Sequence, residues 1–382
     1  MKTFELFLTE SSKKNLHIEH VEDEVFNRGL VGAMDCISFL KAFNSLLEGS
    51  APPLVQASIK WDGSPSIVCG KHPKTGKFFL GTKSVFNTTV PKINYSTKDI
   101  YENYVDQPNL ANRLCVAFNE LSKLDISEVV QGDLLFVEQD LVSKSHNGQT
   151  HITFKPNTIT YSIPANTLLG ESVAKAKVGV VFHTTYTGSC MDSLIPTYKA
   201  DIISTSPSVV IFKSTINTKH TTKTEHTHPI NNRISDLISH FNTLDESALK
   251  TISSTPAMQR IIKRYINSKI ALGESVSISE SYVNEFYQFL ETNHKKFLGY
   301  FLEHRQQVLN LFLFVEKAIS IKESLLRLVS HPENVQMFIE SATGFNSTTI
   351  EGVVISNTTG NVVKLVNRLE FSYRNFNNKG LV

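Results

Sequence analysis

The chain has 382 residues, of which 41% are hydrophobic and 19% are charged, a composition typical of a folded globular protein that excludes a largely disordered chain. Its 38 lysines and arginines nearly balance 36 aspartates and glutamates, which leaves a net charge of +2. A uniformly basic protein that coats nucleic acid is therefore excluded, and any contact with nucleic acid must come from a local patch.

The cysteines and the apolar runs bear on the cellular compartment. Cys36, Cys69, Cys115 and Cys190 are widely separated and form no CxxC pair, which favours a reduced, intracellular setting. The first residues lack the apolar run of a signal peptide, and the longest apolar patch, 309–315, is far too short to span a membrane. We therefore expect a cytoplasmic protein with no membrane partner, and the sequence carries no signal for an oligomeric state.

The first half of the chain predicts one helix followed by many strands. In residues 1–50, apolar residues recur at helical spacing from Val31 until Gly49. From 54 to about 215, short β-branched or aromatic runs alternate with turn residues, and only 110–124 indicates a helix. Strands are predicted at 55–60, 66–70, 78–83, 129–137, 151–155, 158–163 and 178–183.

The second half of the chain predicts a helical block that lies between a polar linker and a β-hairpin. A linker of Ser, Thr, Lys and His is expected from 201 to 231, and four amphipathic helices are expected from 232 to about 341. Residues 349–355 and 361–366 then predict a hairpin. Because two strands alone form a marginal sheet, the hairpin is expected to join the earlier sheet, which makes the helical block an insertion.

The register of this hairpin can be counted from its turn. A four-residue loop, Asn357–Gly360, places Val353 opposite Lys364. Glu351 then shares an apolar face with Lys364 as its diagonal neighbour, about 7–8 Å away. Opposite charges at that spacing indicate a shared ligand, such as a phosphate with its metal ion. A loose ion pair at a sheet edge is the alternative.

Lys60 ends a predicted strand and is followed at once by Trp61-Asp62-Gly63. A neutral lysine beside a tight turn can act as a nucleophile toward phosphorus. Partial burial or nearby positive charge, for which Lys83 and Lys364 are candidates, would lower its pKa and supply the neutral form. Gly63 would let the backbone approach a ligand, and Asp62 would cap the turn or contact a sugar hydroxyl. An ordinary turn after a strand is the alternative.

Two further residues stand out in strand-like runs. Asp133 interrupts an apolar run, where an unpaired carboxylate would be costly to bury, so it should meet a hydroxyl, a cation or a pair of donors. Phe182 could serve as a stacking platform for a flat base, or it could be an ordinary core residue.

Taken in chain order, these elements resemble the covalent nucleotidyltransferase superfamily of ATP-dependent RNA and DNA ligases and capping enzymes. The matching stretches are Lys60-Trp61-Asp62-Gly63 (motif I), Thr82-Lys83-Ser84 (motif Ia), Gln131-Gly132-Asp133 (motif III), 178–186 (motif IIIa), 351–355 (motif IV) and Val363-Lys364-Leu365 (motif V). Stretches 131–136 and 183–186 also resemble ligase-like proteins of large tailed bacteriophages, which would place the chain in the host cytoplasm.

The resemblance implies an α+β fold with a nucleotidyltransferase core, similar to ATP-grasp-like ligases and built from antiparallel sheets. The implied core comprises 51–215 and 345–382, with a helical N-terminal segment at 1–50 and a helical insertion domain at 232–341. Only sixteen residues follow Val366, so no OB domain is expected and capping is disfavoured.

The implied activity is ATP-dependent ligation of polynucleotide ends or nicks, of RNA rather than DNA. Lys60 would attack the α-phosphate of ATP and carry AMP to a 5′-phosphate, from which a 3′-hydroxyl displaces it. Phe182 would stack on adenine and Asp133 would hold the ribose hydroxyls. By the same resemblance, the catalytic residues are Lys60, Asp62 and Lys364; the nucleotide-binding residues are Lys60, Gly63, Lys83, Asp133, Phe182, Glu351 and Lys364; and the ligands of Mg²⁺ or Mn²⁺ are Glu351 and Asp133.

The chain departs from the family pattern at two positions. Val366 replaces the usual second lysine of motif V, with Arg368 as a candidate substitute, and Asp133 replaces the usual glutamate. Two alternatives therefore stay open: a nucleotide-binding or nucleic-acid-binding relative without turnover, and an adenylyltransferase with an acceptor other than a polynucleotide. Basic residues of the helical block would either contact phosphates or be solvated: Lys295, Lys296, Arg305, Lys317, Lys322 and Arg327.

Overall fold

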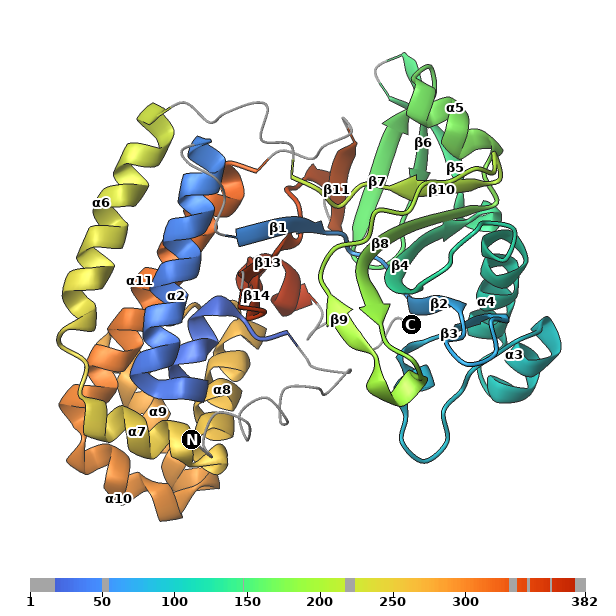
Figure 1. Ribbon diagram of the computed structural model, residues 1–382. Coiled ribbons are helices and arrows are strands. Elements are labelled where there is room, and N and C mark those ends of the chain that lie inside the picture. Colours follow the sequence, from blue (N-terminus) through green and yellow to red (C-terminus); the bar gives the residue numbers. More distant parts are fainter. Residues whose placement is uncertain are drawn as a thin grey trace. The chain divides into compact units, whose positions relative to one another are not determined.

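The computed structural model describes residues 18–49, 55–146, 148–216, 224–329, 335–341, 344–357 and 359–374. The fold is α+β, with 49% helix and 24% strand, which confirms the expected fold class at that level. The chain divides into two compact units, whose elements are labelled in Figure 1. The sheet unit holds the described residues within 61–215 and 335–349, and the helical unit holds those within 18–60, 216–329 and 350–374.

The sheet unit holds two sheets. The first has the strand order β10-β8-β4-β2-β3, with β9 beside β8, and the second has the order β12-β11-β7-β6-β5. All the pairings are antiparallel except that of β8 with β10. The strands of the first sheet are β2 (Ser66–Lys71), β3 (Phe78–Gly81), β4 (Val129–Val137), β8 (Val178–Thr187), β9 (Ile195–Thr197) and β10 (Val209–Phe212). Those of the second are β5 (Val142–His146), β6 (Gln149–Phe154), β7 (Ile159–Pro164), β11 (Gln336–Ser341) and β12 (Gly344–Ser347).

Short helices flank these sheets. They are η2 (Lys83–Phe86), α3 (Thr97–Asn103), α4 (Pro108–Leu121), η3 (Glu138–Asp140), α5 (Leu168–Lys175) and η4 (Met191–Ser193). Helix α4 corresponds to the predicted helix and buries Leu114 and Leu121 in one core cluster with Ile67 and Val180 of the first sheet. Its apolar residues recur every three or four positions, which places them on one side of the helix.

An aromatic layer joins the two sheets of this unit. Phe136 of β4 lies 5.0 Å from Phe154 of β6, and Phe154 stacks on Tyr161 of β7 at 5.4 Å between ring centroids. Phe212 of β10 packs against Phe154 at 5.8 Å. Period-two alternation explains this arrangement, because every second residue of each strand faces the same side.

The helical unit holds long helices and one small sheet. Its helical elements are η1 (Val21–Asp23), α2 (Glu24–Glu48), α6 (Thr224–Phe241), α7 (Glu246–Ser254), α8 (Pro256–Ala271), α9 (Glu280–Asn293), α10 (Lys295–Glu303), α11 (Arg305–Arg327) and η5 (Arg368–Ser372). The strands are β1 (Val55–Lys60), β13 (Gly352–Asn357) and β14 (Val362–Val366). The four predicted helices correspond to α6, α8, α9 and α11, and the shorter α7 and α10 were not predicted.

Helix α2 packs against α6, α7 and α11. It begins seven residues before the predicted start at Val31, and it is kinked at Gly29, where φ is 61°. The predicted range is therefore its longer second part. The stretch Val21–Glu48 is long and apolar enough to cross a membrane, but 44% of its most apolar window is buried inside the protein, and a core helix has the same composition.

The C-terminal hairpin pairs with an early strand, as expected, but not in the large sheet. Strands β1, β13 and β14 form a separate three-stranded sheet in that order, and this sheet belongs to the helical unit. The two compact units thus divide the chain differently from the expected domains, because β1 and the hairpin group with the helices.

Candidate functional site

Lys60 is the last residue of β1, an outer strand of the three-stranded sheet. In the antiparallel pairing with β13, Ile59 lies opposite Val353 and Lys60 lies opposite Gly352. Ile59 and Val353 are both buried, so successive residues place Lys60 on the other, more open face. Lys60, the predicted nucleophile, therefore lies at the end of β1 on the open face of the small sheet.

Glu351 binds Lys60 directly. The Lys60 Nζ donates a hydrogen bond to Glu351 Oε2 at 2.5 Å, although the two residues are 291 positions apart. The carboxylate is largely buried, and hydrogen bonds between two charged groups are among the stronger ones in proteins. Gly352, opposite Lys60, leaves the neighbouring strand position without a side chain.

The register of the hairpin differs by one residue from the predicted register. Lys364 pairs with Val354 rather than with Val353. The cause is the turn, where the backbone N–H of Asn357 donates to the carbonyl of Asn361 at 3.0 Å. The loop between them is one residue shorter than expected, and a shift of one residue moves a side chain to the other face. The predicted shared strand face of Glu351 and Lys364 is therefore wrong.

Lys364 shares the open face with Lys60 instead, because residues directly opposite each other in a sheet lie on one face. Burial lowers the pKa of the Lys364 ammonium, and the positive charge of Lys60 lowers this pKa further. The backbone N–H of Lys364 donates to the carbonyl of Glu19 at 2.9 Å, which fixes the outer side of β14. The sheet thus brings together two lysines on its open face and one carboxylate that contacts Lys60.

Trp61, the residue after Lys60, belongs to the sheet unit and is buried in its aromatic layer. Its indole N–H donates to the carbonyl of Lys213 at 3.1 Å. Its ring lies 5.0 Å from those of Tyr161 and Phe212. The tryptophan of the predicted motif I therefore anchors the chain in the core.

Asp62 is also an anchor. It is 4% exposed, and its Oδ1 accepts a hydrogen bond from Asn157 Nδ2 at 2.7 Å. Its Oδ2 accepts from the backbone N–H groups of Thr158 at 2.6 Å and Ile159 at 2.8 Å. Both oxygens are thus committed to the turn between β6 and β7. The structure gives Asp62 a positioning role, which differs from the catalytic or sugar-binding role predicted for it.

Gly63 passes directly beside Asp133. A Cβ atom on Gly63 would lie 2.6 Å from the Cβ of Asp133 and 3.2 Å from the carbonyl oxygen of Leu134, so a larger residue would displace β4. The Asp133 side chain is 19% exposed, and its Oδ2 lies 3.8 Å from His183 Nε2. A water or a ligand hydroxyl can bridge such a gap. The sheet unit thus places the predicted Gly63 and Asp133 together and adds His183.

Phe182 lies in the core and not beside Asp133. It is 2% exposed and belongs to the cluster that packs under α4, so the predicted stacking of adenine on this ring is wrong. The next residue, His183, faces the side of the sheet that carries Asp133. Sequence reasoning missed His183 because this residue is the extra one in a bulge of β8, opposite Gln131 and Gly132, which shifts the register against β4. The sequence signal that could have identified His183 is its position directly after the apolar run 178–182.

Lys83 is exposed at the start of η2, two residues beyond the end of β3. Gly81 pairs with Val68, so counting two residues onward places Lys83 level with Ser66. The partner of Ser66 on β4 is Asp133. Level positions two strands apart are separated by about 10 Å. Lys83 and Asp133 therefore lie at the same end of the first sheet.

Two basic residues with predicted phosphate contacts are buried in ion pairs. Arg368 NH1 lies 3.1 Å from Asp23 Oδ1 and 3.5 Å from Glu22 Oε1, and its NH2 donates to Asn267 at 2.5 Å. Lys322 is completely buried, with its Nζ 2.6 Å from Glu22 Oε1. Both cations are held in the interior. Arg368 is therefore not the expected substitute for the second lysine of motif V, and Lys322 fits neither of its two alternatives, phosphate contact or solvation.

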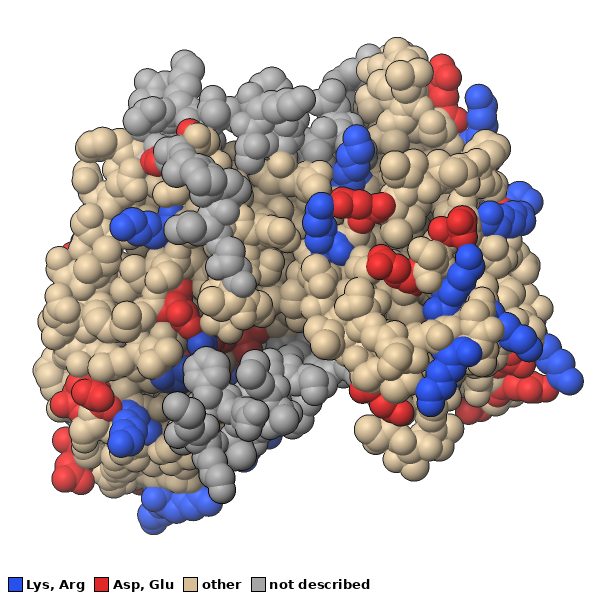
Figure 2. Space-filling model, viewed as in Figure 1, with Lys and Arg blue, Asp and Glu red and all other residues tan. Residues whose placement is uncertain are grey.

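The face of the surface shown in Figure 2 has no large patch of a single charge sign. Figure 2 shows basic and acidic side chains interspersed on the face that it presents, which agrees with the net charge of +2. Four of the basic residues in the helical block that were expected either to contact phosphates or to be solvated are exposed: Lys295, Lys296, Arg305 and Arg327. Lys317 pairs with Asp236.

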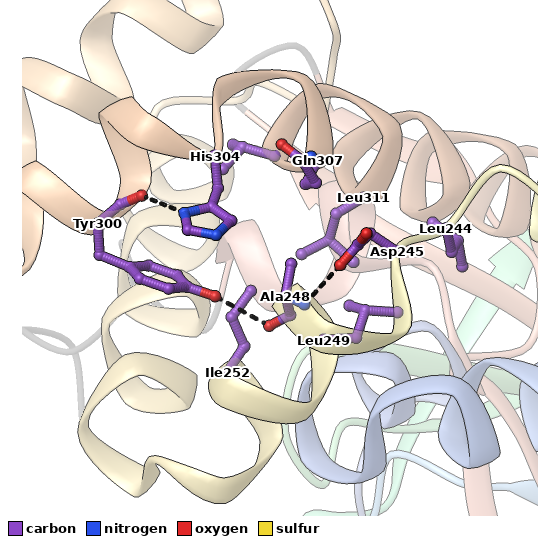
Figure 3. A pocket seen from close by; sticks show the side chains of 10 residues that line it. Leu244, Asp245, Ala248, Leu249, Ile252, Tyr300, His304, Gln307 and Leu311 are labelled. Carbon is purple, nitrogen blue, oxygen red and sulfur yellow. Dashed lines mark hydrogen bonds between the residues drawn. The ribbon is translucent and has the colours of Figure 1, made fainter.

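A cavity in the helical unit is too small for a ligand. It has a volume of about 10 Å³ and lies among α7, α10 and α11, which is room for about one water. Figure 3 shows the Tyr300 hydroxyl donating to the carbonyl of Ala248, at 3.1 Å, and Asp245 accepting from the backbone N–H of the same residue, at 2.7 Å. The His304 ring stacks on that of Tyr300 at 4.3 Å. These contacts join helices, and the cavity is a packing feature.

Within the described parts of the chain, no group of three His, Cys, Asp or Glu residues is placed to hold a metal ion without other ligands. Mg²⁺ is commonly bound by one or two carboxylates together with waters and substrate phosphates. Glu351, which contacts Lys60 on the small sheet that also carries Lys364, suits a site of that kind.

The protein is thus of the α+β class, with a unit of two sheets and a helical unit in which a small sheet collects Lys60, Glu351 and Lys364. The chain belongs to DUF6267, a family of unknown function, which it matches over residues 15–379. No similar curated protein and no similar solved structure was found.

Proposed function

We propose that the chain is an ATP-dependent polynucleotide ligase, acting on RNA ends in preference to DNA ends, with a covalent AMP intermediate on Lys60. The observation that carries the proposal is the sheet β1-β13-β14. It gathers the counterparts of three motifs from distant parts of the chain, with Lys60 bound to Glu351 and with Lys364 on the same face as Lys60.

In the proposed first step, the Lys60 Nζ in its neutral form attacks the α-phosphorus of ATP. A P–N bond forms, and the bond from that phosphorus to the bridging oxygen breaks, so pyrophosphate leaves with the electron pair and the nitrogen releases one proton to solvent. Glu351 holds the Nζ at the end of β1 through its hydrogen bond. Lys364 approaches the phosphate from the same face. The rate gain comes mainly from position and charge.

Glu351 is also the residue that would hold Mg²⁺, whose charge would neutralise the phosphate oxygens. Asp133 and His183 lie on one face of a sheet in the sheet unit. They are the residues of that unit proposed to contact the sugar and the base of a nucleotide, with His183 in place of Phe182.

Self-labelling tests this proposal. The full chain is incubated with Mg²⁺ and ATP labelled at the α-phosphate, denatured, and analysed for bound label. Wild type should retain acid-labile, hydroxylamine-sensitive label, and Lys60→Ala should retain none. Lys41→Ala is the control, because Lys41 is an exposed lysine of α2 in the same unit. Wild type without label would overturn the proposal. Sealing of nicked RNA, nicked DNA and single-stranded RNA then identifies the substrate.

One observation favours a second candidate, a nucleotide-binding relative without turnover. The usual second lysine of motif V is absent, and Arg368, its candidate substitute, is buried against Asp23. Such a protein would bind ATP without acquiring label. A protein that labels itself but passes AMP to none of the polynucleotides would instead be an adenylyltransferase with another acceptor.

A further inference from the structure

The two faces of the sheet β12-β11-β7-β6-β5 differ in character. One face contributes Phe154 and Tyr161 to the aromatic layer. The other face carries polar residues of β6 and β7, namely His151, Thr153, Thr160 and Ser162. In an antiparallel sheet with one packed face, polar residues of the second face are usually solvated. Here these four are only 3–7% exposed.

These four residues line a cavity of about 240 Å³. Lys144 and Ser145 of β5 and Phe338 of β11 also line it. All of these described lining residues belong to the sheet unit. The volume is more than twenty times that of the packing cavity among the helices, so this cavity has room for a ligand group and not only for a water.

The chemistry of the lining suits an anion. His151 Nδ1 lies 3.0 Å from Ser162 Oγ, and Lys144 lies directly opposite His151 in the pairing of β5 with β6. Thr153 and Thr160 add hydroxyls, and none of the described residues that line the cavity has a carboxylate. An ammonium, an imidazole and several hydroxyls around one space are the groups that bind phosphoryl oxygens.

Phe338 adds an apolar ring at the other side of the cavity. It lies opposite Thr160 in the pairing of β11 with β7. Strand β7 separates it from His151 on β6, and counting through Thr160 places Phe338 level with Lys155, four residues beyond His151. Two interstrand spacings, about 10 Å, and about 13 Å along the strands therefore lie between the two residues. An aromatic ring can stack on a nucleobase of any sequence. A phosphoryl group near His151 and a base on Phe338 would therefore lie across the strands.

We propose that this cavity is a second ligand site, which binds a phosphorylated nucleotide by its phosphoryl group and its base. The nucleotide is either free or the terminal residue of a polynucleotide, since both present the same groups. The site goes beyond the proposed function, because it shares no residue with the sheet that carries Lys60.

Protection of Lys144 from acylation tests the site. The full chain carrying Lys60→Ala is treated with a lysine-acylating reagent, and modification of Lys144 is measured by peptide mass spectrometry. Inorganic phosphate, AMP, a 5′-phosphorylated oligonucleotide and its 5′-hydroxyl counterpart are added separately. Saturating AMP should slow the acylation of Lys144 about tenfold, and phosphate alone should protect at higher concentration only. Lys98, an exposed lysine of the same unit, is the internal control and should not change.

Variants complete the test. Ser162→Ala should raise the AMP concentration needed for protection about tenfold, and Phe338→Leu should raise it for AMP but not for inorganic phosphate. Protection by the 5′-phosphorylated strand but not by the 5′-hydroxyl strand would identify a polynucleotide end, and protection by AMP alone would identify a free nucleotide. Equal reactivity of Lys144 with and without every ligand would overturn the proposal, and would leave the self-labelling of Lys60 untouched.

Discussion

The two units bury polar side chains of different kinds. Those buried in the helical unit are mostly charged: Glu22, Asp23, Glu24, Asn44, Lys269, Lys322, Glu351 and Arg368. Those buried in the sheet unit are mostly neutral: Asp62, Asn94, Glu120, Gln131, His151, Thr153, Thr160, Ser162 and Thr184. A buried charge needs a partner of opposite sign, whereas a neutral group needs only a hydrogen bond. The helical unit is therefore the part whose stability depends on charge pairing.

The charged interior of the helical unit joins segments far apart in the chain. Lys322 of α11 binds Glu22 of η1 across 300 positions, and Arg368, after β14, binds Asp23. Lys60 and Glu351 form a third long-range pair, at the more open end of the small sheet. The same kind of contact thus serves stability at one place and, in the proposed function, catalysis at another.

The largest effect is expected at Lys322. Lys322→Met keeps much of the side-chain volume but leaves Glu22 buried without its ammonium partner, so it should lower the free energy of unfolding by about 3–5 kcal/mol. Urea unfolding followed by circular dichroism at 222 nm measures this loss, because that signal reports the helices. Lys317→Ala is the control. Lys317 pairs with Asp236, which is 60% exposed, and its loss should change the free energy by less than about 1 kcal/mol.

A double variant separates charge pairing from packing. Glu22→Gln with Lys322→Met removes both charges, and it should be more stable than Lys322→Met alone, because replacing a whole buried pair costs less than breaking it. If the double variant were less stable than the single one, burial of an unpaired carboxylate would not be the cause of the loss.

The elements of this fold were largely predictable, and their register was not. Runs of β-branched residues predicted β1, β4 and β8 because period-two alternation is a local property. The register of the hairpin depends on whether its turn has three or four residues, and the sequence around Asn357 does not decide between the two. The predicted four-residue turn placed Lys364 on the face of Glu351, whereas the structure places it on the face of Lys60. A bulge at His183 in β8 similarly places His183, and not Phe182, on the face that carries Asp133.

The partners of the candidate residues were even less predictable. Lys60 and Glu351 were singled out separately, but their contact depends on a pairing of β1 with β13 across most of the chain. Asp62 was predicted to cap its turn or contact a sugar, whereas it binds the turn between β6 and β7 almost 100 residues away. A single sequence reports local pattern well, and these contacts come from long-range packing.

A smaller effect is expected in the sheet unit, at Asp62. Asp62→Ala removes the acceptor of three hydrogen bonds, two of them from backbone groups, and should lower the free energy of unfolding by about 2–3 kcal/mol. Trp61 is the only tryptophan of the chain and is buried in this unit, so its fluorescence reports the transition of the sheet unit. Asp125→Ala is the control, since that carboxylate is 87% exposed. A midpoint equal to that of wild type would show that Asp62 does not anchor the turn.

The smallest expected effect is a loss of stability of the helical unit as the pH falls. Burial alone would raise the pKa of Glu22, but the charges of Lys322 and Arg368 lower it below the usual value of 4.5. A carboxyl group with a lowered pKa in the folded state contributes stability that is present above about pH 4.5 and is lost as the pH falls through the folded-state pKa. Burial raises the pKa of the neighbouring Asp23, which acts in the opposite direction.

The double variant described above isolates the part that belongs to Glu22. It keeps Asp23 but has no carboxyl group at position 22, so its unfolding midpoint at 222 nm should fall less steeply than that of wild type as the pH is lowered below 4.5. Parallel curves for the two proteins would mean that Glu22 has the same pKa in the folded and unfolded chains. The interior of the helical unit would then not depend on pairing of this carboxylate, and the contrast with the neutral interior of the sheet unit would lose its energetic meaning.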